Sequence, residues 1–176
     1  TLQTPSAGSV GTSQLASNAV TTAKIADNAV TYAKSTGFGK VAQVINGVDG
    51  TYASTTSSTF IDTNLSASIT PSSTSSKILV YAVNFIYVIS NSYASWRVLR
   101  DSTEIIGLQT VGNTSATDND QQPTPIFYLD SPSTTSQITY KTQWKRRAGS
   151  GNIYINNYSD NAGDTKSTMV LMEILT

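Results

Sequence analysis

The 176-residue chain contains no cysteine and no histidine. Disulfide frameworks, metal sites built on thiolates or imidazoles, and catalytic triads that use histidine are therefore excluded within this sequence. Enzymatic chemistry would have to rest on carboxylates, lysine or tyrosine, and Asp and Glu together number only 11. We expect a protein that is not an enzyme and that binds no cofactor and no metal.

Charge is also scarce, because Asp, Glu, Lys and Arg make up 12% of the residues and the formal net charge is zero. The chain thus lacks the basic surface that nucleic-acid binding or attachment to a membrane surface requires. Its longest apolar stretch, Ile78 to Ile89, is interrupted by Asn84 and is shorter than the ~20 residues of a membrane-spanning helix. We expect neither a nucleic-acid partner nor insertion into a membrane.

Residues 10–34 are repetitive and read VGTSQLASNA, VTTAKIADNA and VTYAK. At a period of ten, Val10, Val20 and Val30 share one column, and Leu15 and Ile25 share another. A continuous α-helix would scatter the valines around its axis, and a continuous strand would put the two columns on opposite sides. The pattern instead predicts one helical turn through residues 23–26, capped by a threonine, then a turn at residues 27–28 and an extended step.

Each repeat offers only two or three apolar side chains, which is too few to form a core within one chain. Copies of the chain that wind around a common axis would bury these columns against one another. We therefore predict an intertwined homotrimeric stalk over residues 1–36. A flexible linker rich in Ala, Ser and Thr is the alternative. The glycines of Ser35–Lys40 end the repeats, and residues 37–176 are predicted to form a separate head domain.

The head is predicted to be all-β, a jelly-roll-like β-sandwich, because short β-rich segments alternate with clusters of Gly, Pro, Asn, Asp and Ser. The predicted strands are Val41–Asn46, Thr51–Thr56, Thr59–Thr70, Lys77–Ile89, Ser95–Arg100, Glu104–Gln109, Pro125–Leu129, Gln137–Arg146, Asn152–Tyr158 and Thr168–Leu175.

Alternation of side chains predicts how some of these strands are covered. In Gln137–Arg146 apolar and polar residues alternate, which indicates one face toward water. In Lys77–Ile89 both faces are apolar, so this strand should lie in the middle of the domain or at a contact between subunits. The last strand has the same character, and its Glu173 should be either an edge residue or a paired buried charge.

The segment AVTTAKIADNAVT (Ala19–Thr31), which contains one ten-residue repeat, resembles the shaft repeats of bacteriophage tail-fibre proteins, especially those of marine short-tailed phages. Four further segments resemble the terminal modules of such fibres: ITPSSTSSKILV (Ile69–Val80), WRVLRDSTEIIG (Trp96–Gly107), YLDSPSTTSQITYKTQWK (Tyr128–Lys145) and STMVLMEI (Ser167–Ile174). Together these segments are spread over most of the length of the chain.

The resemblance implies a trimeric virion protein of the tail that adsorbs to a glycan or an outer-membrane protein of the host. It also implies an upstream region, missing here, that joins other tail proteins. Two alternatives stay open. The chain could be a collar or head decoration fibre without receptor binding. It could also belong to a polysaccharide-cleaving tailspike, for which the carboxylate pairs Asp101/Glu104 and Asp118/Asp120 lie in turns with no sign of a groove.

Receptor contact is predicted on loops at the end of the sandwich opposite the stalk. The two longest polar loops, Gly112–Thr124 and Asn156–Lys166, are the candidates. Their candidate binding residues are Asn113, Asp118, Asn119, Asp120, Asn157, Tyr158, Asp160 and Asn161. Residues 118–120 alternate oxygen ligands as a calcium loop does, but they lack its glycine and its bidentate glutamate, so an ordinary loop is expected.

A second candidate is the basic cluster Lys145-Arg146-Arg147, which could contact phosphate groups of a cell-surface polymer. Tyr154, Tyr158 and Trp144 could stack on sugar rings beside it. The alternative is a strand end whose charges prevent edge-to-edge aggregation. For Trp144 the core is the favoured place, and for Trp96 the core or the trimer contact.

Overall fold

The computed structural model of the chain describes residue 17, residues 19–26, residue 29, and residues 41–89, 91–112, 119–158, 161–162 and 165–176. The chain divides into two units, Thr1–Gly39 and Lys40–Thr176, whereas the sequence predicted a boundary after residue 36.

In the first unit, a short 3-10 helix, η2 (Thr22–Lys24), replaces the predicted turn over residues 23–26. Ala29 N donates a hydrogen bond of 2.9 Å to Ala26 O, and residues 27–28, where the repeat predicts a turn, lie outside the described residues. Val20 and Ile25, which represent the two apolar columns, are 57% and 41% exposed. Most of the predicted stalk lies outside the described residues.

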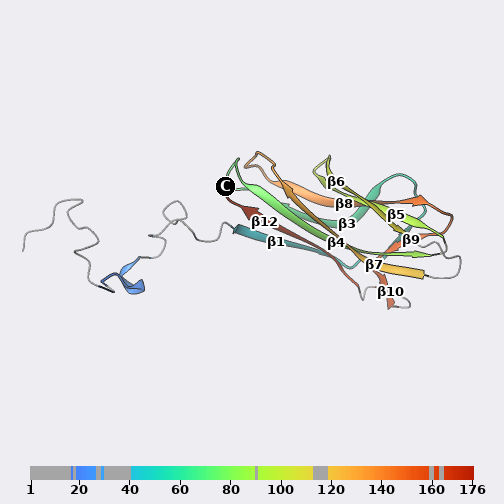
Figure 1. The fold of residues 1–176 in the computed structure, drawn as a ribbon, viewed down its shortest axis with the longest axis horizontal. Coiled ribbons are helices and arrows are strands. Elements are labelled where there is room, and N and C mark those ends of the chain that lie inside the picture. The colour runs from blue at the N-terminus through green and yellow to red at the C-terminus, as the bar shows by residue number, and fades with distance from the viewer. Residues whose placement is uncertain are drawn as a thin grey trace, which may run out of the picture. The chain divides into compact units, whose positions relative to one another are not determined.

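Lys40–Thr176 is an all-β unit (Figure 1). Its strands are β1 (Val41–Asp49), β2 (Ala53–Thr55), β3 (Ile61–Ile69), β4 (Lys77–Ile89), β5 (Tyr93–Arg100), β6 (Thr103–Gly112), β7 (Asn119–Asp130), β8 (Ile138–Ala148), β9 (Ile153–Ile155), β10 (Asn157–Tyr158), β11 (Asn161–Ala162) and β12 (Ser167–Ile174). No helix among the described residues is long and apolar enough to cross a membrane.

Two antiparallel sheets form the sandwich. In sheet A the order is β1-β12-β4, and β4 also pairs with β7 along its length and with β9 near its end, where β9 pairs with β2. In sheet B the order is β3-β8-β5-β6. The eight long strands are β1, β3, β4, β5, β6, β7, β8 and β12. Numbered from one to eight along the chain, they are ordered 1-8-3-6 in sheet A and 2-7-4-5 in sheet B. This is the connectivity of a jelly roll, so the predicted fold of the head is confirmed.

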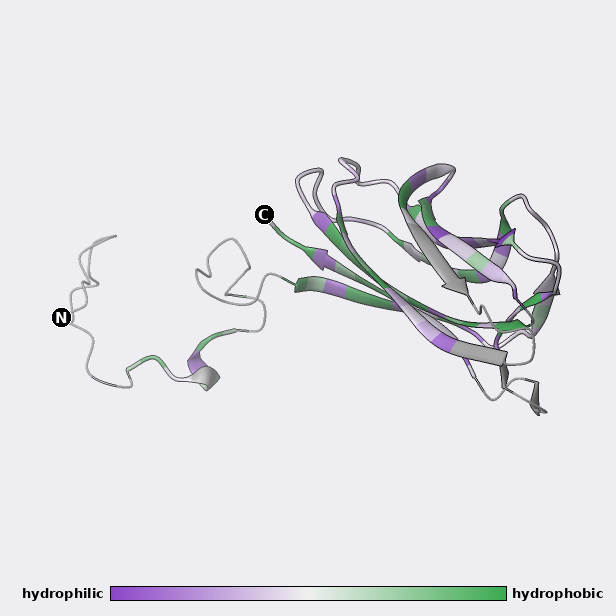
Figure 2. Cartoon of the chain, turned by 45° about the vertical axis from the view of Figure 1, so that its right-hand side comes forward, coloured by the Kyte–Doolittle hydropathy of each residue, from purple (hydrophilic) through white to green (hydrophobic). Residues whose placement is uncertain are grey.

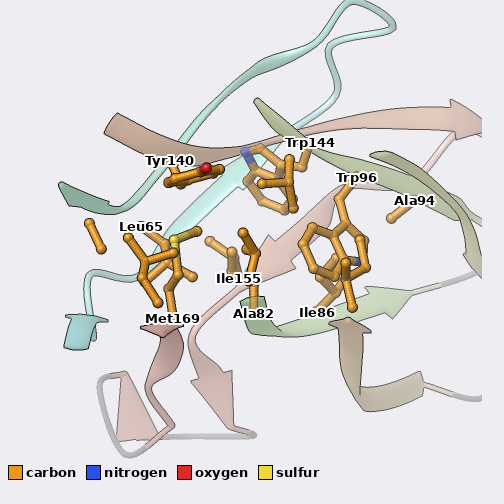
Figure 3. Packing of buried hydrophobic residues seen from close by; sticks show 14 of the residues in the cluster. Leu65, Ala82, Ile86, Ala94, Trp96, Tyr140, Trp144, Ile155 and Met169 are labelled. Atoms are coloured by element: carbon orange, nitrogen blue, oxygen red, sulfur yellow. The ribbon is translucent and has the colours of Figure 1, made fainter. Parts of the chain in front are cut away.

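The core lies between the two sheets and consists of one side of each strand (Figure 3). β4 presents Ile78, Val80, Ala82, Ile86 and Val88 to it, and all five are fully buried. Across from them are the largest core side chains, Trp96, Trp144 and Tyr140. The assignment of both tryptophans to the core is therefore confirmed. The outer side of β4 is half-buried in the single chain, with only Val83 fully covered.

Several predicted boundaries were wrong, each for a local reason. β7 begins at Asn119, not Pro125, because its polar first half pairs with β4 as far as Ile89. The predicted strand Asn152–Tyr158 is broken into β9 and β10 at Asn156, whose φ of 57° lies in the left-handed region, outside regular strand geometry. β8 pairs with β3 and β5, so it is not the edge strand that the aggregation argument assumed.

Glu173 is neither at a sheet edge nor in an ion pair among the described residues: it lies buried on the interior strand β12, and neutral groups donate hydrogen bonds to its charge. Its Oε2 accepts a hydrogen bond from Gln43 Nε2, and its Oε1 accepts two from the backbone N–H and the hydroxyl of Ser72, all 2.7 Å long. Burial by itself raises the pKa of this carboxyl, but the hydrogen bonds outweigh it and lower the pKa to about 2. Glu173 thus fastens the β3–β4 connection to β1 and β12.

A second buried network joins the two sheets. The carboxylate of Asp130, at the end of β7, accepts hydrogen bonds from Arg100 Nη1 of β5 at 2.6 Å and from the hydroxyl of Tyr140 of β8 at 2.7 Å. Burial and the bond to Asp130 raise the pKa of Tyr140 above its usual range. Asp130 stays buried because both partners compensate its charge.

Candidate functional site

The register of sheet A defines two ends of the sandwich. Val41, the first residue of β1, pairs with Ile174, and Ile174 pairs with Lys77, the first residue of β4. The start of β1 therefore lies level with the start of β4, and we call this end of the sandwich the near end. Asn119 pairs with Ile89, the last residue of β4, which defines the far end. Figure 1 shows the start of β1 and the C-terminus at one end and β10 at the other. β4 is 13 residues long, which separates the ends by about 40 Å.

The described residues of both predicted loops lie in the far half of the sandwich. β6 finishes at Gly112 and β7 starts at Asn119, beside the end of β4. The β9–β10 connection is fixed there by a hydrogen bond of 3.0 Å from Asn156 N to Phe85 O. The predicted placement of these segments, opposite the entry of the chain, agrees with this register.

The loops are shorter than predicted. Asn119 and Asp120 belong to β7, while Asn157 with Tyr158 forms β10 and Asn161 belongs to β11. β10 and β11 pair as a small antiparallel hairpin, with Tyr158 opposite Asn161. The other candidates, Asn113, Asp118 and Asp160, lie outside the described residues. The structure therefore brings the two segments to one end, and contact of their side chains with a ligand stays a prediction.

Asn156 is fully buried, so the first residue of the predicted loop Asn156–Lys166 is not available for receptor contact. Its Nδ2 donates to Asp49 Oδ2 at 3.0 Å and to Thr51 O at 3.1 Å. Its Oδ1 accepts from the backbone N–H of Ser167 at 3.0 Å and from the Ser167 hydroxyl at 2.6 Å. Asn156 thus anchors the far-end hairpin to β1 and β12, and a sequence search for binding residues cannot distinguish such an anchor from a ligand contact.

A cluster of tyrosines lies beside this anchor on the outer side of sheet A. The rings of Tyr52 and Tyr154 are stacked with centroids 6.1 Å apart, and Tyr87 meets Tyr154 at 5.5 Å in a tilted arrangement. Tyr52 is 43% exposed. Exposed aromatic rings with phenolic hydroxyls are suited to stacking on sugar rings. We call these three residues the tyrosine cluster; sequence reasoning proposed only Tyr154 of the three.

The predicted group of Trp144, Tyr154 and the basic cluster is not assembled. Trp144 is buried in the core from sheet B, whereas Tyr154 lies on the outer side of sheet A. Lys145 lies 4.6 Å from the ring centroid of Phe60, and Arg146 Nη1 donates to the carbonyls of Ser150 and Gly151. Arg147 is exposed and lines, with Tyr93 and Ala148, a shallow hollow of about 240 Å³ at the far end. The three basic side chains do not converge on one point.

The carboxylate pair proposed for polysaccharide cleavage is engaged elsewhere. Asp101 Oδ1 accepts the backbone N–H of Thr139 at 2.9 Å, and Glu104 Oε2 accepts Arg97 Nη1 at 2.7 Å. Both lie around the β5–β6 turn at the near end. The other pair includes Asp118, which lies outside the described residues.

No family model matches this sequence, and no curated protein matches it. Solved structures with a similar arrangement include T=1 particles derived from infectious bursal virus, at 13% identity and a TM-score of 0.39 over 76% of this chain and 36% of that chain. The VP2 subviral particle of infectious bursal disease virus is similar at 12% identity and a TM-score of 0.37 over 76% and 37%. This chain spans little more than a third of the length of those chains.

Proposed function

We propose that this chain is the distal part of a trimeric bacteriophage tail fibre that binds a host-surface receptor without cleaving it. The sequence resemblance supports the fibre class. The observation that supports the receptor-binding part is the position of the far end: the described residues of the two polar segments and the tyrosine cluster lie toward it, away from the start of β1.

The chemistry of the far end favours a glycan over an enzyme substrate. Tyrosine rings and amide side chains bind sugars by stacking and hydrogen bonding, and three copies of a weak site gain affinity through avidity. Two hollows among the described residues, of about 110 Å³ and 240 Å³, are smaller than the ~300–1,000 Å³ of small-molecule sites. In this proposal, an upstream region connects the fibre to other tail proteins of the virion.

The test is binding of the fluorescently labelled full chain to a panel of bacterial strains, before and after periodate oxidation of surface glycans. A strain that is stained should lose the stain after oxidation, and the Tyr52→Ala variant should bind at least about tenfold more weakly. Thr135→Ala, an exposed change at the near end, should bind like the wild type.

Other outcomes would overturn the proposal in different ways. Staining that survives oxidation but not surface proteolysis would replace the glycan with a protein receptor. If the chain is incorporated into virions but does not stain the bacterial strains that those virions infect, the protein would be a decoration fibre. Release of reducing sugar from capsule would make it a tailspike.

A further inference from the structure

Toward the near end, the outer side of sheet A is an apolar surface that extends across β1, β12, β4 and β7. The register places Val44, Met172, Leu79 and Leu129 in one row, and Asn46, Val170, Tyr81 and Phe127 in the next. A third row consists of Val48, Thr168, Val83 and Pro125. Hydrophobic colour runs along these strands in Figure 2. We call these three rows the apolar face.

Much of this face is exposed in the single chain. Phe127 is 65% exposed, Val44 56%, Val48 52% and Leu129 48%, and the Phe127 ring stacks on Tyr81 with centroids 4.4 Å apart. None of the three rows contains a charged residue.

The outer side of sheet B is different. There Lys141 pairs with Asp62 at 3.1 Å and Arg97 with Glu104 at 2.7 Å, and Gln143 donates to Asp62 at 2.7 Å. Arg97 and Lys145 both lie over the ring of Phe60. The outer side of sheet B thus carries the ion pairs and polar groups usual on a solvent-exposed surface, whereas the apolar face of sheet A carries exposed apolar side chains and no charge.

We infer that the apolar face is the contact between copies of this chain. This inference rests on the trimer of the proposed function and identifies the surface that forms it. Four strands ~4.8 Å apart and three rows that take up about six residues at ~3.3 Å give a face of roughly 380 Å². A continuous apolar patch of this size on one molecule often marks a surface that binds a partner.

The path of the chain identifies that partner as a second copy. The repeats of residues 10–34 have two apolar columns, and their representatives Val20 and Ile25 are exposed. If copies bury these columns along a shared axis, the six residues 35–40 allow β1 to begin within about 20 Å of that axis. β1 is the edge strand of sheet A and carries Val44 and Val48 of the apolar face. The same axis therefore brings the apolar faces of the copies together.

The area supports this arrangement. A stable interface buries about 800 Å² on each partner, so a face of roughly 380 Å² forms about half of it and the repeats supply the rest. The tyrosine cluster lies beyond the three rows, around the far half of β4, and stays outside the contact.

The test uses the full chain at 1–100 µM, about the range in which weak oligomers dissociate, with mass measured by light scattering. Val44→Glu and Leu129→Glu place a carboxylate at opposite edges of the face, on β1 and β7. Each should weaken assembly at least ~100-fold, because the interface would have to bury a charge in every copy. Val44→Thr, which keeps the shape without charge, should weaken it less. Ser66→Glu, on the outer side of sheet B opposite Lys141, should leave the mass unchanged.

Melting curves establish that each variant is folded, and two variants on separate strands guard against a local defect in one. Assembly of both Glu variants at the wild-type mass would overturn the inference, as would a wild-type chain that is monomeric throughout. If a dimer is broken by the same changes, the contact face stands and the trimeric fibre does not. If a trimer is broken by them yet stains no cell, the face stands and the receptor-binding proposal does not.

Discussion

At the scale of single residues, the carboxyl of Glu173 makes the fold sensitive to acid. Its pKa is about 2 in the folded protein and near 4.5 without the fold, so the folded state favours the charged form. The contribution of this carboxyl to the free energy of unfolding is therefore complete above about pH 4.5 and is lost as the pH falls toward 2. We expect Glu173→Gln to lower the free energy of unfolding at pH 7 by on the order of 2–3 kcal/mol, and the difference from wild type to shrink by pH 2.5.

Urea unfolding at pH 7, 4 and 2.5 measures this difference. Glu104→Gln is the control, since Glu104 pairs with Arg97 at the surface and such pairs contribute at most ~1 kcal/mol. A Glu173→Gln variant as stable as wild type at pH 7 would contradict the assignment.

The side chain and the backbone of Asn156 can be tested separately. Asn156→Ala removes four hydrogen bonds and keeps a β-carbon at φ 57°, so we expect a loss of about 3 kcal/mol or more. Asn156→Gly removes the same bonds but adopts this φ without strain, so it should lose less than the alanine variant. Thermal melting of both variants separates the loss of the side-chain hydrogen bonds from the backbone strain. Equal melting temperatures of the two variants would show that the backbone strain is negligible.

Residues of this kind limit what the sequence can predict. Tyr140, Trp96 and Trp144 follow from alternation, because a core position is signalled by its neighbours two residues away. The roles of Asn156 and Glu173 depend on partners more than 100 residues away, or on a single left-handed φ, and no local pattern encodes either. For the same reason, the sequence predicted that the candidate segments lie away from the start of β1, as their described residues do, but it took the anchor Asn156 for part of an exposed loop.

At the scale of elements, β1 crosses closely over β3 at Gly47. A β-carbon there would lie 2.3 Å from the backbone oxygen of Ser66, which cannot move without shifting the strand. We expect Gly47→Ala to destabilise the head by several kcal/mol, in the upper range for overpacking. Gly50→Ala is the matched control, since its β-carbon would meet only the flexible side chain of Lys166 at 3.4 Å. Urea unfolding of both measures the contrast, and equal stabilities would mean that the two strands separate easily.

The elements themselves were predicted well where the strand has a buried side. β4 begins and ends where its apolar alternation predicts, and β3 and β12 fall within a few residues of their predicted bounds. The prediction failed at β7, whose first half is polar. Its place in the sheet comes from backbone pairing with β4 and not from the burial of its side chains, and pairing of this kind leaves no periodic signal.

At the scale of the whole molecule, assembly should depend on the repeats as well as on the head. The chain that starts at Gly37 keeps the apolar face but loses the columns of Val10, Val20, Val30, Leu15 and Ile25. Because the face alone falls short of the ~800 Å² that a stable contact buries on each partner, this truncated chain should still associate, but more weakly than the full chain. We expect trimers of the full chain at 1 µM, and dissociation of the truncated chain at about the same concentration, measured by light scattering.

Adding Leu129→Glu to the truncated chain should make it monomeric even at about 100 µM, because the contacts of the repeats and of the apolar face are then both removed. If the truncated chain assembles as tightly as the full one, residues 10–34 are a linker and the head alone makes the trimer. A full chain that is monomeric at 1 µM and above would mean that the apolar columns do not pair between copies, and the stalk would have to be abandoned.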